Sequence, residues 1–150
     1  MFYSLSYYSN PNDAGTKGTA RQIAKDVVAW MRDVQNDAFM TNLRAGLLSD
    51  AKRHKPSIKT FVDYLRELPT GSVYAGMSEL TVFAKISKGI VHVCLSTNGN
   101  GQYAIQPKGE YMIWETLNFV PNGAPPAFEA YIKYNGINHF EALLDVQIIA

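Results

Sequence analysis

Apolar residues in the first half of the chain recur with the spacing of α-helices. A first helix is predicted to begin near Thr19, whose hydroxyl can accept a hydrogen bond from an otherwise unpaired first-turn N–H. Behind it, apolar side chains follow an i, i+4, i+7, i+8, i+11 spacing, at Ile23, Val27, Trp30, Met31 and Val34. This spacing places them on one face of a helix, so we expect that face to pack against a core.

Three further helices are predicted before residue 90. They cover residues 37–52, the stretch from Pro56-Ser57 to the residue before Pro69, and residues 78–86. Gly89 is expected to end the last one, because glycine readily takes the left-handed conformation that closes a helix. The inward-facing positions are Met40, Leu43, Leu47, Ile58, Phe61, Val62, Leu65, Leu80 and Phe83.

From residue 90 the period changes to that of β-strands. Residues 90–95 (IVHVCL) are β-branched and nearly all apolar, which predicts a strand buried on both faces. Residues 128–134 alternate apolar and polar side chains, which predicts a half-exposed strand. Further strands are expected within residues 103–105, 111–119 and 139–144, with turns at Asn98-Gly99 and Asn135-Gly136. The prediction is an α+β fold, with helices of the N-terminal half packed on a small, mostly antiparallel sheet.

Composition narrows the function classes. The 150 residues suit one domain (1–150), and the formal net charge of +1 gives no general field for nucleic acid or anionic lipid. A single cysteine excludes a disulfide framework and a cysteine-rich zinc site. No apolar run approaches the roughly 20 residues that cross a bilayer, and the first residues lack the basic start of a signal peptide. We therefore expect a cytoplasmic monomer that binds neither nucleic acid nor membrane.

His139 and Glu141 have the clearest potential for chemistry. They stand two positions apart in an expected strand, so their side chains leave the same face, with Cα atoms roughly 6.5 Å apart. A carboxylate on one imidazole nitrogen fixes the tautomer and raises the basicity of the other, as in a nucleophile–base–acid triad. The same spacing is also common on the solvent side of an edge strand, so both interpretations stay open.

Three short segments, spread over nearly the whole chain, carry a resemblance. Residues 1–6 read MFYSLS, residues 74–84 read YAGMSELTVFA and residues 134–143 read YNGINHFEAL. In this order they resemble three motifs of the OTU-family (ovarian-tumour-type) cysteine proteases. The first segment is similar to the residues after the nucleophile in Gly-Asp-Cys-Leu-Phe-x-Ala-Leu. The middle segment resembles Trp-Gly-Gly-x-x-Glu-Leu-x-Ala-x-Ala, and the last resembles the C-terminal histidine motif, which is His, an aromatic, then Asp or Asn.

The resemblance implies a papain-type cysteine protease fold and a deubiquitinase activity. Such enzymes hydrolyse isopeptide or peptide bonds after the C-terminal tail of ubiquitin or a ubiquitin-like protein, in the cytoplasm (the host cytosol for a pathogen effector). A thiolate would stand at the start of the helix near Phe2, where the helix dipole lowers its pKa. His139 would serve as base and then as acid, and Glu141 or Asn138 would orient it. No metal or organic cofactor is required.

The chain also departs from the family pattern. The nucleophile falls directly before Met1, so we expect the sequence as given to bind substrate tails without cleaving them. Glu141 is one methylene longer than the usual Asp, and Tyr74-Ala75-Gly76 replaces Trp-Gly-Gly.

Three alternatives remain open at this point. The chain can be a non-catalytic, ubiquitin-binding domain of the same fold, or an unrelated α+β domain in which the matches are coincidental. In the third, Cys94 substitutes for the nucleophile with His92 from the same strand face, although an apolar strand favours a buried, inert thiol. His54 is interpreted as part of a solvated basic turn.

Overall fold

The computed structural model describes residues 1–2, 5, 17–95, 110–134, 140–142 and 147–149. Its helices are α2 (Lys17–Arg32), α3 (Asp37–Met40), α4 (Arg44–His54), α5 (Phe61–Glu67) and α6 (Met77–Ser87). Two short 3₁₀ turns are η2 (Val34–Asn36) and η3 (Leu68–Thr70). The strands are β1 (Ile90–Leu95), β2 (Glu110–Asn118), β3 (Glu129–Tyr134), β4 (Phe140–Ala142) and β5 (Gln147–Ile149). The predicted hairpin strand at 103–105 lies outside the described residues.

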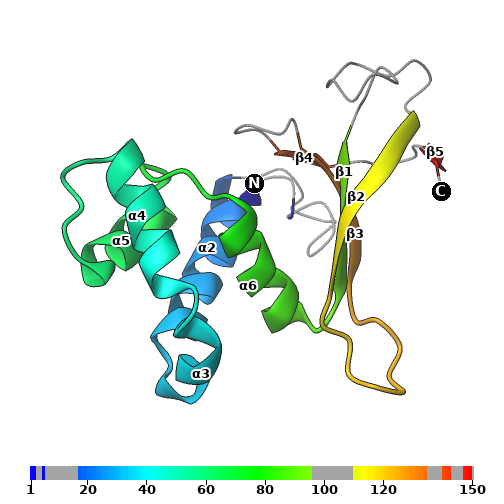
Figure 1. Cartoon of the computed structure of the whole chain (residues 1–150), viewed down its shortest axis with the longest axis horizontal. Coiled ribbons are helices and arrows are strands. Elements are labelled where there is room, and N and C mark those ends of the chain that lie inside the picture. Colours follow the sequence, from blue (N-terminus) through cyan, green and yellow to red (C-terminus); the bar gives the residue numbers. More distant parts are fainter. Residues whose placement is uncertain (3–4, 6–16, 96–109, 135–139, 143–146, 150) are drawn as a thin grey trace.

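The described strands form one mixed sheet in the order β4-β3-β1-β2-β5. The β1–β2 and β3–β4 pairs are antiparallel, while β1–β3 and β2–β5 are parallel. The helices lie on one side of this sheet (Figure 1). The α+β prediction, with helices in the N-terminal half, is therefore confirmed. The sheet differs from the expected, mostly antiparallel one, because β3 returns beside β1 in the same direction instead of extending a meander.

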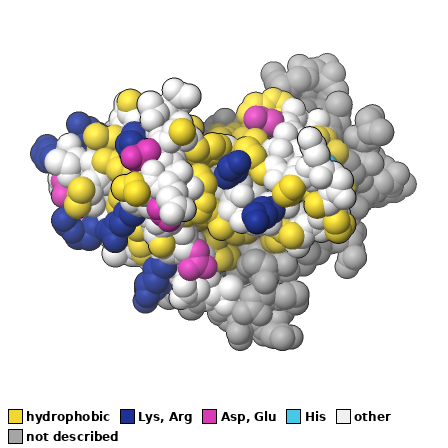
Figure 2. Space-filling view, turned by 90° about the horizontal axis from the view of Figure 1, so that it is seen from below, with side chains coloured by type: hydrophobic (Ala, Val, Ile, Leu, Met, Phe, Trp, Pro, Cys, Tyr) yellow, Lys and Arg dark blue, Asp and Glu magenta, His cyan; other side chains and the backbone are white. Residues whose placement is uncertain are grey.

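The core lies between the helices and the covered face of the sheet. Val91 and Val93 of β1 are fully buried, as are Ala130 and Ile132 of β3. On the face shown in Figure 2, positive and negative side chains are interspersed over the helical half of the molecule. Among the described helices, none is both long and apolar enough to cross a lipid bilayer.

The helices depart from the expected pattern at their ends. Val34 lies beyond α2 in η2 and is 76 % exposed, so its assignment to the apolar stripe was wrong. A turn over residues 41–43 divides the expected 37–52 helix into α3 and α4. Helix α5 begins after Thr60, whose hydroxyl accepts a hydrogen bond from the Asp63 N–H at 3.1 Å while the Asp63 carboxylate accepts from the Thr60 N–H at 3.0 Å. This capping box sets the start of α5 after Pro56-Ser57 and leaves Val62 60 % exposed.

The junction between α6 and β1 differs from the prediction in one residue. Lys88, with φ +51°, takes the left-handed conformation that was expected of Gly89. Gly89 is needed for a different reason. A Cβ atom on it would stand 2.3 Å from the carbonyl oxygen of Phe128, which enters β3 directly alongside. The absence of a side chain at Gly89 therefore lets β1 and β3 start side by side.

Candidate functional site

The N-terminal residues form a helical turn that is anchored in the core. The Leu5 N–H donates to the Met1 carbonyl at 3.1 Å, the i to i−4 bond of an α-helix. Leu5 is fully buried, and Met1 and Phe2 pack partly buried against the same core. The structure therefore holds the residue that follows the predicted nucleophile position in a defined place.

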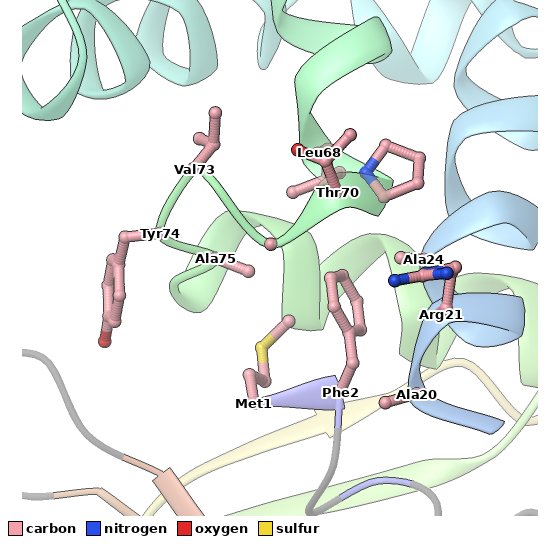
Figure 3. Close-up of a pocket in the computed structure, with 12 residues that line it drawn as sticks. Met1, Phe2, Ala20, Arg21, Ala24, Leu68, Thr70, Val73, Tyr74 and Ala75 are labelled. Carbon is pink, nitrogen blue, oxygen red and sulfur yellow. The ribbon is translucent and has the colours of Figure 1, made fainter. Parts of the chain in front are cut away.

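A cavity of about 280 Å³ opens beside this turn. Its walls come from the N-terminal turn, from α2, and from the segment that runs from η3 to α6 (Figure 3). The lining residues are Met1, Phe2, Ala20, Arg21, Ala24, Leu68, Pro69, Thr70, Gly71, Val73, Tyr74 and Ala75. Most of these side chains are apolar, and Arg21 is the cation among them. Its volume is close to the lower end of the range for small-molecule sites.

Tyr74 connects the cavity to the C-terminal strands. Burial raises the pKa of Tyr74 to about 12, and the neighbouring Tyr134 and Glu79 add to the rise. Tyr134 in turn stacks on Phe140, with ring centroids 4.6 Å apart, and on Trp114 at 6.0 Å. The Tyr74 hydroxyl is buried and has no hydrogen-bond partner among the described residues. Tyr74 therefore lines the cavity and is near enough to Tyr134 of β3 for Tyr134 to affect its pKa.

Glu79 fixes the segment before α6 that lines the cavity. Its side chain is buried, with 5 % of the residue exposed. One carboxylate oxygen accepts the Gly76 N–H at 2.8 Å, and the other accepts the Tyr64 hydroxyl at 2.8 Å. The carboxylate thus caps the start of α6 and joins it to α5, which fixes the segment that carries Tyr74. Burial raises the pKa of Glu79, and these hydrogen bonds oppose the rise without cancelling it.

This raised pKa predicts an unusual dependence of stability on pH. The folded protein binds the Glu79 proton more tightly than the unfolded chain does, so the free energy of unfolding should fall as the pH rises above the unfolded pKa. In a Glu79→Gln variant this contribution is absent. Urea unfolding at pH 5 and pH 8 should therefore show wild type gaining stability relative to Glu79→Gln at the lower pH. A difference that grows with pH would contradict the assignment.

The predicted catalytic residues are only partly described. His139 and Asn138 lie outside the described residues, so the expected groove beside the N-terminal turn is not tested at these positions. Glu141 occupies the middle of β4, where its main chain is in register with Lys133 of β3. The structure does describe the residue after His139, because Phe140 stacks on Tyr134 with ring centroids 4.6 Å apart.

Cys94 is buried, and burial raises the pKa of its thiol to about 11. The alternative in which His92 activates it is wrong, because both imidazole nitrogens have other partners. Nδ1 is 3.0 Å from the Thr116 hydroxyl, and Nε2 is 2.9 Å from a Glu129 carboxylate oxygen. Cys94 is therefore a structural thiol. His54 is exposed at the end of α4, as expected of a solvated basic turn.

Sequence patterns missed the cavity itself. Arg21 gave no signal beyond one charge on an amphipathic helix, and the tyrosine hydroxyl became notable only when its burial was known. Among the described residues, no group of three or more His, Cys, Asp or Glu side chains is placed to hold a metal ion. Compared with known proteins, the chain matches no protein-family model, and no curated protein matches it significantly.

Proposed function

We propose that this chain is the main part of a cysteine-type isopeptidase domain of the OTU kind, which acts on the C-terminal tails of ubiquitin or ubiquitin-like proteins in the cytoplasm. The nucleophilic cysteine belongs directly before Met1, and His139 is the general base.

One observation carries the proposal. Tyr74 lines a cavity together with Met1, and it is near enough to Tyr134, on which Phe140 stacks, for Tyr134 to raise its pKa. The N-terminal turn beside the predicted nucleophile position and the residue after the predicted histidine thus converge on the neighbourhood of Tyr74. A base has to lie within or near hydrogen-bond reach of its nucleophile, and this convergence supports such an approach.

The reaction follows from these roles. His139 takes the thiol proton, and the sulfur attacks the carbonyl carbon at the end of the tail. The tetrahedral intermediate collapses to a thioester as His139 gives the proton to the departing amine. Water, deprotonated by His139, then hydrolyses the thioester and regenerates the thiol. Main-chain N–H groups at the start of the N-terminal turn are suited to stabilise the oxyanion.

A covalent probe tests the proposal. The chain is prepared with Gly-Asp-Cys added before Met1 and incubated with ubiquitin that carries an electrophile at its C-terminus. We expect a stoichiometric adduct, visible as a mass shift, because the added thiol would stand at the start of the N-terminal turn and, in this proposal, beside His139 as its base.

Two matched proteins serve as controls. The same extension with serine in place of cysteine, and the 150-residue chain itself, should form no adduct. An adduct on Cys94 in the unextended chain would contradict the proposed nucleophile position. Tight, non-covalent binding of ubiquitin with no adduct in the cysteine form would instead favour a binding domain of this fold.

A further inference from the structure

One wall of the cavity has main-chain groups without partners. Among the described residues, neither the N–H nor the C=O groups of Val73, Tyr74 and Ala75 form a hydrogen bond. The flanking residues differ, because the Ser72 N–H donates to Thr70 and the Gly76 N–H donates to Glu79. Val73 and Ala75 are nevertheless buried, at 5 % and 8 % exposure. Main-chain groups in such surroundings are nearly always paired in folded proteins, so this segment lacks a partner within the part of the chain that the structure describes.

The rest of the cavity defines the chemistry of that partner. Ala24 and Leu68 are 2 % exposed, and together with Phe2 they contribute apolar side chains to the rest of the lining. In Figure 3 the Arg21 guanidinium extends from α2 toward the middle of the lining residues. Arg21 forms no ion pair with any residue that the structure describes. An apolar group with a carboxylate beside it complements this surface.

We propose that the cavity binds an extended peptide, in which an apolar side chain enters the cavity and an adjacent acidic side chain pairs with Arg21. In this proposal the peptide main chain pairs with the free N–H and C=O groups of Val73, Tyr74 and Ala75, in the way that an extended peptide pairs with the open edge of a sheet. A free aliphatic acid satisfies the cation and the apolar wall but leaves the main chain unpaired, so a peptide fits better. Binding at this site needs no thiol, although the cavity lies against Met1, beside the proposed nucleophile position.

The 150-residue chain can be tested directly by fluorescence anisotropy. The probe is a fluorescein-labelled hexapeptide, Gly-Val-Asp-Leu-Val-Gly, with an amidated C-terminus. We expect saturable binding that weakens roughly threefold or more when the peptide Asp becomes Asn, because a partly exposed ion pair is lost. N-methylation of the peptide main chain at Leu and Val should weaken binding at least as much, since it removes the donors that a strand needs. Octanoate should compete poorly.

Protein variants locate the site. Arg21→Gln should lower the affinity for the Asp peptide to that for the Asn peptide and make binding less dependent on salt. Lys25→Gln on the same helix removes an equal charge and should change the affinity little. Ala24→Phe should block binding by filling the cavity, and Ala20→Leu serves where Ala24→Phe lowers the melting temperature. Absent binding, equal binding of the Asp and Asn peptides, or binding unaffected by N-methylation or by both filling variants would overturn the proposal. Because no hydrolysis is measured, these outcomes are independent of the cysteine-extended protein.

Discussion

In a protein extended by cysteine before Met1, replacing His139 by alanine should lower the rate of hydrolysis by at least about a thousandfold. Without the base, the thiol is no longer activated as a nucleophile. The measurement is release of a fluorophore from the C-terminus of ubiquitin, under single-turnover conditions that separate chemistry from binding. His139→Ala should leave the affinity for ubiquitin nearly unchanged, because the loss concerns the transition state and not the ground state.

The orienting residue should have a smaller effect. Glu141→Ala is expected to lower the rate by roughly ten- to a hundredfold. The imidazole of His139 is still present as the base, but it has lost the group that fixes its tautomer. If Asn138→Ala has the larger effect, Asn138 is the orienting residue. Cys94→Ala is the matched control, and it should leave the rate unchanged because that thiol is buried. Full activity of His139→Ala would remove the basis for the proposed mechanism.

Gly89→Ala should destabilise the fold by about 3 kcal/mol, near the upper end of the usual range for overpacking. The new Cβ would meet the Phe128 carbonyl oxygen at 2.3 Å and the Phe128 Cβ at 2.7 Å. That carbonyl accepts the Ile90 N–H at 2.8 Å, so relieving the clash also strains the first hydrogen bond between β1 and β3. Urea unfolding followed by circular dichroism measures the change.

Gly46→Ala is the matched control for this substitution. Gly46 lies within α4, and a Cβ there meets no atom within 4 Å. Alanine should stabilise this helix by roughly 0.5–1 kcal/mol, because it loses less backbone entropy on folding than glycine does. Equal effects at the two glycines would show that the close approach at Gly89 is absent in solution.

Periodicity predicted the elements whose own residues determine them. The stripe of α2 and the strand β1 were both found, and β1 has the predicted bounds, because each element buries a continuous apolar face. The prediction that β1 is buried on both faces was wrong, because Ile90, His92 and Leu95 are only partly buried. In α2 the last stripe position failed at Val34. The α-helix ends before Asp33, because the Asp33 carboxylate accepts the Gln35 N–H and starts a 3₁₀ turn there.

Non-local pairing explains the other misses. Strand β5 covers only Gln147–Ile149, which is too short for any period to be detected, and its place is set by pairing with β2. The parallel pairing of β1 with β3 is likewise not visible in the residue pattern of either strand. Gly89 was correctly recognised as special, but its conformational reason was assigned to the wrong residue because the approach of Phe128 comes from far along the chain.

The candidate site was predictable to a similar extent. Burial of Cys94 followed from its strand neighbours and is confirmed. The roles of His139 and Glu141 stay predictions. Arg21 and Tyr74 meet at one cavity only because α2 and the segment before α6 pack side by side around the N-terminal turn. No pattern within either segment reports such packing.

The central position of β1 has a consequence for how the protein folds as it is synthesised. β1 pairs on one edge with β2 and on the other with residues Glu129–Tyr134, which follow it by more than thirty positions. The helices rest on contacts that close early, whereas β1 keeps one row of unpaired main-chain groups until β3 has left the ribosome. A nascent chain whose emerged part ends near Asn118 should therefore have formed its helices while it exposes an open apolar strand edge. Pairing of this kind is slow and prone to association, so a chaperone that shields strand edges should bind this chain most strongly at that length.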